Sequence, residues 1–114
     1  MKQDKFSMTL LFDYYGELLT EKQKTCFDLY YNQDLSLSEI AAEAHISRQG
    51  VHDTLARAEA LLENFEQKTG CVARDVRVRQ ALSDICDAAG QLLQLPDAAA
   101  LAGTILAAAG RIKE

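Results

Sequence analysis

The sequence contains no tryptophan, a single proline and only six glycines. Proline and glycine are the residues that most readily interrupt helices, so their scarcity favours long, regular helices. Alanine, leucine, glutamate, glutamine and lysine are abundant, and no stretch alternates apolar and polar residues for long enough to indicate a strand. A hydrophobic content of 48% over 114 residues is enough for a core. The sequence therefore predicts an all-α protein.

Long apolar runs are also missing. The sequence has no stretch of about eighteen apolar residues, which argues against a transmembrane helix. The N-terminal residues MKQDKFSMTLLFDYYG contain neither the apolar run nor the small-residue cleavage site of a secretory signal. We therefore expect a cytoplasmic protein with no membrane partner.

Residues suited to metal binding or catalysis are few. The cysteines Cys26, Cys71 and Cys86 lie far apart without CxxC spacing, which indicates reduced thiols. The two histidines, His45 and His52, do not have the i, i+4 spacing of a helical metal site. The sequence also contains no glycine-rich phosphate loop and no nucleophile elbow. We expect a protein that is not an enzyme and needs no metal and no cofactor.

Basic residues are outnumbered by acidic ones. The net charge is −5, and residues 1–70 carry seven basic and twelve acidic side chains, whereas residues 71–114 carry five of each. Because phosphate neutralisation supplies most non-specific affinity for nucleic acid, this balance argues against tight non-specific binding of DNA. The densest basic patch is Arg74, Arg77 and Arg79. Three cations are too few to define a nucleic-acid footprint, so ordinary salt bridges are the favoured interpretation of this patch.

Residues 36–68 have the pattern of a helix-turn-helix. Ser36 followed by Glu39 is a capping box, which predicts the start of a short first helix. His45 occupies the turn, and Ser47 is placed to cap a long second helix that ends at Gly70. The apolar residues of the two helices and the turn fall on facing sides, as packing of a crossed helix pair requires; they are Leu37, Ile40, Ala41, Ala44, Ile46, Val51 and Leu55.

The first turns of the second helix are the part of a helix-turn-helix that reaches base edges in the major groove. Arg48, Gln49, His52 and Asp53 occupy these turns, and Gly50 loosens them. We predict a nucleic-acid-binding site made of Ser47, Arg48, Gln49, His52 and Arg57.

Two further helices are predicted before this motif. Ser7 is placed to cap the first, over residues 8–19, whose aromatic residues and leucines, Leu18 among them, form an apolar face. Thr20 with Gln23 is a second capping box, which opens a helix over residues 20–31. The turn signal Asn32, Gln33 and Asp34 follows it.

Heptad-like seams continue to the C-terminus. The seam of the fourth helix is Val51, Leu55, Ala58, Leu62 and Phe65, and a fifth helix over residues 72–94 repeats the spacing in Val78, Leu82, Ile85, Ala89 and Leu92. Leu95-Pro96 ends the fifth helix, and Leu101, Ile105, Ala108 and Ile112 form the stripe of a sixth. We predict that these seams form a homodimer interface through Val78, Leu82, Ile85 and Leu92. The alternative is a monomer in which the fifth and sixth helices fold back as a hairpin over the first four.

The runs LLFDYYGELLTEKQ and LSLSEIAAEAHISRQGV, within residues 10–70, closely resemble the YlxM family of small bacterial proteins. The resemblance implies a helix-turn-helix related to the promoter-reading region 4 of sigma factors, and a dimer. It also implies genes beside those of the signal recognition particle, and regulation of that pathway through its GTPase or its RNA. Ser47, Arg48 and Gln49 match the family's pattern, whereas His45, Gly50 and His52 stand where Gly, Ala and Tyr are expected.

Two functions follow from these observations. The first is a regulatory protein, connected with the signal recognition particle pathway, that binds DNA, or RNA, through a helix-turn-helix domain at residues 1–70 and dimerises through a helical extension at residues 71–114. The second is an adaptor of the signal recognition particle that binds protein or RNA and modulates its GTPase without touching duplex DNA. The acidic balance of residues 1–70 favours the second function, and Ser47, Arg48 and Gln49 at a helix start favour the first.

Overall fold

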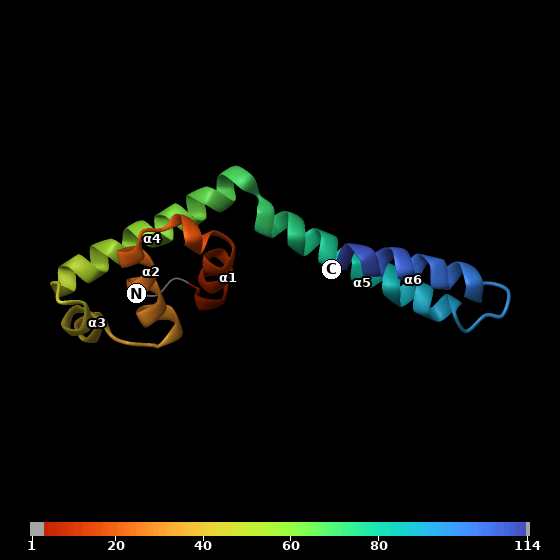
Figure 1. The fold of residues 1–114 in the computed structure, drawn as a ribbon, viewed down its shortest axis with the longest axis horizontal. Coiled ribbons are helices and arrows are strands. Elements are labelled where there is room, and N and C mark those ends of the chain that lie inside the picture. Colours follow the sequence, from red (N-terminus) through yellow and green to blue (C-terminus); the bar gives the residue numbers. More distant parts are fainter. Residues whose placement is uncertain (1–3, 114) are drawn as a thin grey trace. The chain divides into compact units, whose positions relative to one another are not determined.

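The computed structural model describes residues 4–113, and every regular element within this range is helical, as the sequence predicts (Figure 1). The chain divides into two compact units, Met1–Val72 and Ala73–Glu114. Among the described residues, no helix is both long enough and apolar enough to cross a membrane.

Helix α1 spans Lys5–Tyr15, and its N-cap is Asp4. The Asp4 carboxylate accepts hydrogen bonds from the backbone N–H of Ser7 at 3.3 Å and from the Ser7 hydroxyl at 2.6 Å. The prediction that Ser7 caps this helix is therefore wrong, because Ser7 is the third helical residue. A carboxylate bonded to free N–H groups also interacts favourably with the helix dipole, which explains why the helix begins at the earlier residue.

A short 3₁₀ turn, η1 (Gly16–Leu18), follows α1 and changes which leucine is buried. The 3₁₀ turn advances by a larger angle per residue than an α-helix, so the α-helical spacing of the apolar face does not continue through it. Leu18, which the sequence places on the apolar face, is 65% exposed, and Leu19 is buried in its stead.

Helix α2 (Glu21–Phe27) begins at the predicted capping box. The backbone N–H of Thr20 donates to Gln23 Oε1 at 3.0 Å, and the N–H of Gln23 donates to Thr20 Oγ1 at 3.2 Å. A π-helical turn, η2 (Asp28–Asn32), continues α2 without a break.

Helices α3 (Leu37–Ala44) and α4 (Arg48–Thr69) form the helix-turn-helix. Both bonds of the Ser36–Glu39 capping box are present, at 2.8 and 3.1 Å. His45 ends α3 in the left-handed conformation, with φ 59° and ψ 39°, a region in which histidine occurs more often than most side chains. At the far end of α4, Gly70 adopts φ 65°, the conformation expected of a glycine that terminates a helix.

The core of the first unit forms along α4. Ala58 and Leu62 belong to one buried cluster with residues of α1 and α2, and Val51 and Leu55 belong to a second cluster with Ile40 of α3. The complete clusters are Met8, Tyr15, Leu19, Phe27, Tyr31, Ala58, Leu62 and Val72, and Cys26, Leu29, Ile40, Val51 and Leu55. Because the seam of α4 is covered inside its own unit, the prediction that it contributes to a dimer interface is wrong.

The second unit is a helical hairpin. Helix α5 (Cys71–Leu92) and helix α6 (Ala99–Lys113) lie side by side and run in opposite directions, joined by turns over residues 93–98 (Figure 1). Leu82 and Ala89 of α5 and Ala102 and Ala109 of α6 are buried. The buried residues of α6 are alanines, so the packed side of this helix is made of small side chains.

Candidate nucleic-acid interface

The N-terminal half of α4 presents polar side chains to solvent. Arg48, Gln49, His52 and Arg57 are all exposed, whereas Val51 and Leu55, which face the core, are buried. These four polar residues are therefore open to solvent on one packed helix, with Arg48 and Arg57, nine residues apart, on different sides of it. Groups held on a packed helix lose little conformational freedom when they bind, which suits them to recognition.

Ser47 has a structural role at the start of this surface. Its hydroxyl oxygen accepts the backbone N–H of Gly50 at 2.9 Å, which caps α4. A Cβ added at Gly50 would lie 3.1 Å from that oxygen. An alanine at residue 50 would therefore press on the capping serine, so its gain in helix propensity would be partly cancelled.

A carboxylate lies among the polar residues of this surface. The side-chain amide of Gln49 donates to Asp53 Oδ1 at 3.0 Å, and His52 Nδ1 lies 3.4 Å from the same oxygen. These bonds, that of His52 first, hold the pKa of Asp53 below its usual 3.8, and the nearby positive charge of Arg57 lowers it further. Asp53 is therefore ionised at neutral pH and orients Gln49 and His52.

A hollow lies between α2 and the first half of α4. Thr20, Lys22 and Gln23 line it from α2, and the residues that line it from α4 are Gly50, Asp53, Thr54 and Arg57. Sequence reasoning placed Arg57 at the interface but missed Thr20 and Lys22, because only the tertiary packing of α2 against α4 brings them beside it. The capping box at Thr20 is the one local signal, and it predicts a helix start, not a neighbour.

A second, more apolar hollow shares Gln23 and Arg57 with the first. Its other lining residues are Ala60, Leu61 and Asn64, all on α4. The two hollows therefore adjoin at Gln23 and Arg57, and the one farther along α4 is the more apolar.

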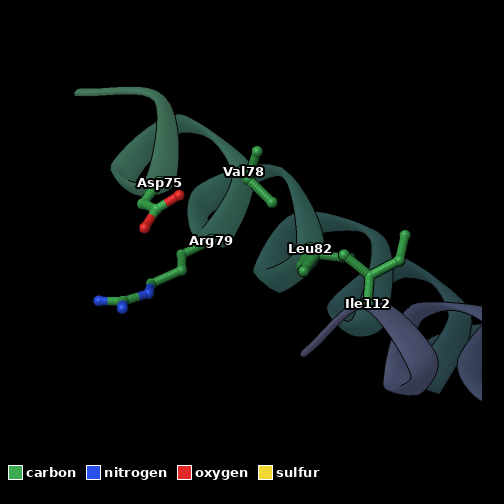
Figure 2. A pocket seen from close by; sticks show the side chains of 5 residues that line it. All are labelled: Asp75, Val78, Arg79, Leu82 and Ile112. Atoms are coloured by element: carbon green, nitrogen blue, oxygen red, sulfur yellow. The ribbon is translucent and has the colours of Figure 1, made fainter. Parts of the chain in front are cut away.

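The residues predicted for a dimer interface lie on α5. Val78, Ile85 and Leu92 are 39%, 44% and 38% exposed, whereas Leu82 is 5% exposed. Figure 2 shows Leu82 beside Ile112 of α6, with Val78 one turn away along α5, in a hollow also lined by Asp75 and Arg79. Arg79 is the one member of the predicted basic patch that lines this hollow; Arg74 and Arg77 are exposed elsewhere on α5.

Within residues 4–113, no group of three or more His, Cys, Asp or Glu side chains is arranged to bind a metal ion. The three cysteines form no disulfide. Cys26 is buried, Cys71 is exposed and Cys86 is half-buried. Burial raises the pKa of the Cys26 thiol, so it acts as a small apolar core residue.

The capped short helix, the left-handed turn residue and the long second helix with exposed polar first turns define the class of helix-turn-helix proteins. Residues 2–97 match a protein family described as "Putative helix-turn-helix protein, YlxM / p13 like", UPF0122. The chain belongs to this family, which confirms the resemblance found in the sequence.

Relatives occur in several bacteria. A UPF0122 protein of Thermoanaerobacter sp. strain X514 is 52% identical over 85 residues, which cover 75% of this chain and 73% of the relative. One of Desulforamulus reducens is 49% identical over 78 residues, covering 68% and 67% of the two chains. One of Bacillus licheniformis is 56% identical over 61 residues, covering 54% and 57%.

Proposed function

We propose that this protein is a cytoplasmic regulator that binds nucleic acid through the first turns of α4 and does no catalysis. The observation that carries the proposal is the exposure of Arg48, Gln49, His52 and Arg57 on a helix that Val51 and Leu55 anchor in the core. Arginine pairs with guanine and glutamine with adenine in the major groove, so this set is chemically suited to base readout. The family's helix-turn-helix description supports the same function.

Arg48→Ala tests the proposal directly. A base contact through arginine contributes about 1–3 kcal/mol, and a phosphate contact would lower the salt slope of binding by about one. Arg74→Ala is a matched control, because Arg74 is also exposed but lies on α5. Binding of duplex DNA and of RNA should be measured by fluorescence anisotropy, with circular dichroism to verify folding. Unchanged binding of both nucleic acids by a folded Arg48→Ala variant would refute contact through the start of α4.

We propose further that the protein is a homodimer and that the exposed apolar side chains of α5 lie at its interface. Val78, Ile85 and Leu92 support this proposal because a two-fold partner would bury one self-complementary patch on each subunit, with Leu82 beneath it. Two subunits would also present two α4 helices to paired half-sites.

Ile85→Asp is the sharpest test of the dimer, because Ile85 is exposed and its replacement leaves the buried Leu82 in place. A carboxylate brought into an apolar interface without a partner costs several kcal/mol, so the variant should shift from dimer to monomer. Ser83→Asp, at an exposed neighbouring position, is the charge control. Sedimentation equilibrium gives the mass of both variants. A wild type that stays monomeric at high concentration would disprove the proposed dimer.

The second candidate function is an adaptor that works on the signal recognition particle without binding duplex DNA. The excess of acidic over basic side chains in residues 1–70, twelve against seven, supports this candidate. The resemblance to YlxM proteins links both candidates to that particle. The two candidate functions can be distinguished by recovering the tagged protein from its own cells and identifying the RNA, DNA and protein bound to it. Particle components without DNA would support the adaptor.

A further inference from the structure

The hollow between α2 and α4 brings two positive charges together beside the predicted recognition surface. Lys22 comes from α2 and Arg57 from α4, and both side chains are exposed. Among residues 4–113, Lys22 forms no ion pair, whereas Lys24 on the same helix lies 3.3 Å from Glu17 and 3.5 Å from Glu21. The charge of Lys22 is therefore available to a ligand, and that of Lys24 is already neutralised.

The size of the hollow limits what it can hold. Its volume is about 280 Å³, just below the range of about 300–1,000 Å³ in which small-molecule pockets fall. The lining also includes the hydroxyl of Thr20, which accepts the N–H of Gln23 and can still donate its own proton. Two cations and a hydroxyl donor are the groups that proteins use to hold one phosphate of a nucleic-acid backbone.

We propose that Lys22, Arg57 and Thr20 bind a backbone phosphate of the nucleic acid whose bases meet the first turns of α4. This proposal rests on the function proposed above and extends the interface to α2. Asp53 lines the hollow, and its carboxylate is bonded to Gln49 and lies close to His52, which connects the phosphate site to these base-reading residues. Clamping one strand from α2 fixes the register in which α4 enters the groove.

Asp53 lines the same hollow and opposes the phosphate. Its carboxylate is bonded to Gln49 and lies close to His52, so it is anchored within α4. A fixed negative charge beside a phosphate site weakens binding to every sequence alike. Only ligands that also satisfy the base-reading side chains then bind tightly. The structure therefore assigns opposite roles to Lys22 and Asp53, and these roles predict opposite effects of neutralising each residue.

The experiment measures the affinity of the full chain for a random-sequence duplex DNA and for a single-stranded RNA as salt is varied. For duplex DNA each phosphate contact contributes about 0.9 to the slope of log affinity against log salt. Lys22→Gln should lower that slope by about this amount for each subunit bound, so a fourfold rise in salt should weaken the wild type about 3.5-fold more than the variant per bound subunit. Asp53→Asn should increase affinity for the random duplex. Lys24→Gln, the matched control, should have the wild-type slope.

Three outcomes would count against the proposal in distinguishable ways. If the wild type binds neither probe, both the proposed function and this phosphate site are wrong. If the wild type binds and Arg48→Ala weakens binding, but Lys22→Gln has the same slope as Lys24→Gln, the phosphate site alone is wrong. A loss of slope that is equal and substantial in Lys22→Gln and Lys24→Gln shows a general charge effect, and it overturns the site as well. Circular dichroism of each variant verifies that its helices are intact.

Discussion

Removing the hydroxyl of Tyr15 should destabilise the first unit by about 2 kcal/mol. The Tyr15 hydroxyl lies in a partly buried network at the end of α4, where it donates to Glu66 Oε1 at 2.5 Å and lies 2.6 Å from the hydroxyl oxygen of Thr69. The same Glu66 oxygen accepts the backbone N–H of Val72 at 3.0 Å. Tyr15 therefore ties α1 to the residues on both sides of Gly70, where α4 ends and α5 begins.

The magnitude follows from the partners that Tyr15→Phe leaves behind. A hydrogen bond to a charged group, such as that to Glu66, contributes about 1.5–3 kcal/mol. The bond with Thr69 joins two neutral hydroxyl groups and contributes about 1 kcal/mol. The phenyl ring keeps the packing of Tyr15 against Phe65, whose ring centroid is 6.0 Å away. Glu66 keeps the Val72 N–H as a donor, so its carboxylate is not stranded, and the net loss falls well below the sum of the two bonds.

Urea unfolding monitored by circular dichroism measures this loss, with Glu63→Gln, an exposed position on α4, as the control. Burial raises the pKa of Tyr15 above 10.0, and its bond to Glu66 raises it further. The raised pKa means that the folded state favours the protonated hydroxyl of Tyr15. The greater unfolding free energy of the wild type over Tyr15→Phe should therefore persist below pH 10 and disappear as the pH rises through the folded-state pKa. Equal midpoints for the wild type and Tyr15→Phe below pH 10 would refute the reasoning.

Two predictions concern the start of α3. Ser36→Ala should cost about 1 kcal/mol, because it removes the acceptor for the N–H of Glu39; an unchanged unfolding midpoint would show that this cap contributes nothing. The backbone bond from Ser36 holds the pKa of Glu39 below 4.5, so its stabilising effect is present above pH 4.5 and is lost as the pH falls through the folded-state value. Glu39→Gln should not show this loss, and parallel acid titrations of the two proteins would contradict the assignment.

The helix starts show which parts of this fold could be predicted from sequence. The capping boxes at Thr20 and Ser36 and the cap at Ser47 depend on residues within three positions of each other, so a linear pattern is sufficient to find them. The first helix start was misplaced because Asp4 and Ser7 are both good caps at that spacing, and the bond between them was needed to choose.

The α5 seam shows that the sequence pattern predicts a helix but not which of its apolar side chains are buried. Its spacing predicts a helix with one apolar face, and α5 has that form. The same spacing cannot tell that Leu82 is covered by the returning α6 while Val78 and Ile85 remain exposed. The sequence does not reveal the hollow between α2 and α4 for the same reason, because Lys22 and Arg57 are distant in sequence and line it together only through packing.

Because the proposed nucleic-acid interface contains few cations, the proposed dimer would be important for binding. Lys22, Arg48 and Arg57 allow about three phosphate contacts from one subunit, which corresponds to a salt slope near −2.7 for duplex DNA. That term alone gives weak non-specific binding in a chain of net charge −5. A dimer that engages two half-sites would double the slope, and the second site would bind at a high effective concentration. Ile85→Asp should therefore weaken DNA binding and halve the salt slope, although Ile85 lies on α5 and outside the proposed interface with nucleic acid. Full affinity and slope in a monomeric Ile85→Asp variant would show that one subunit is sufficient.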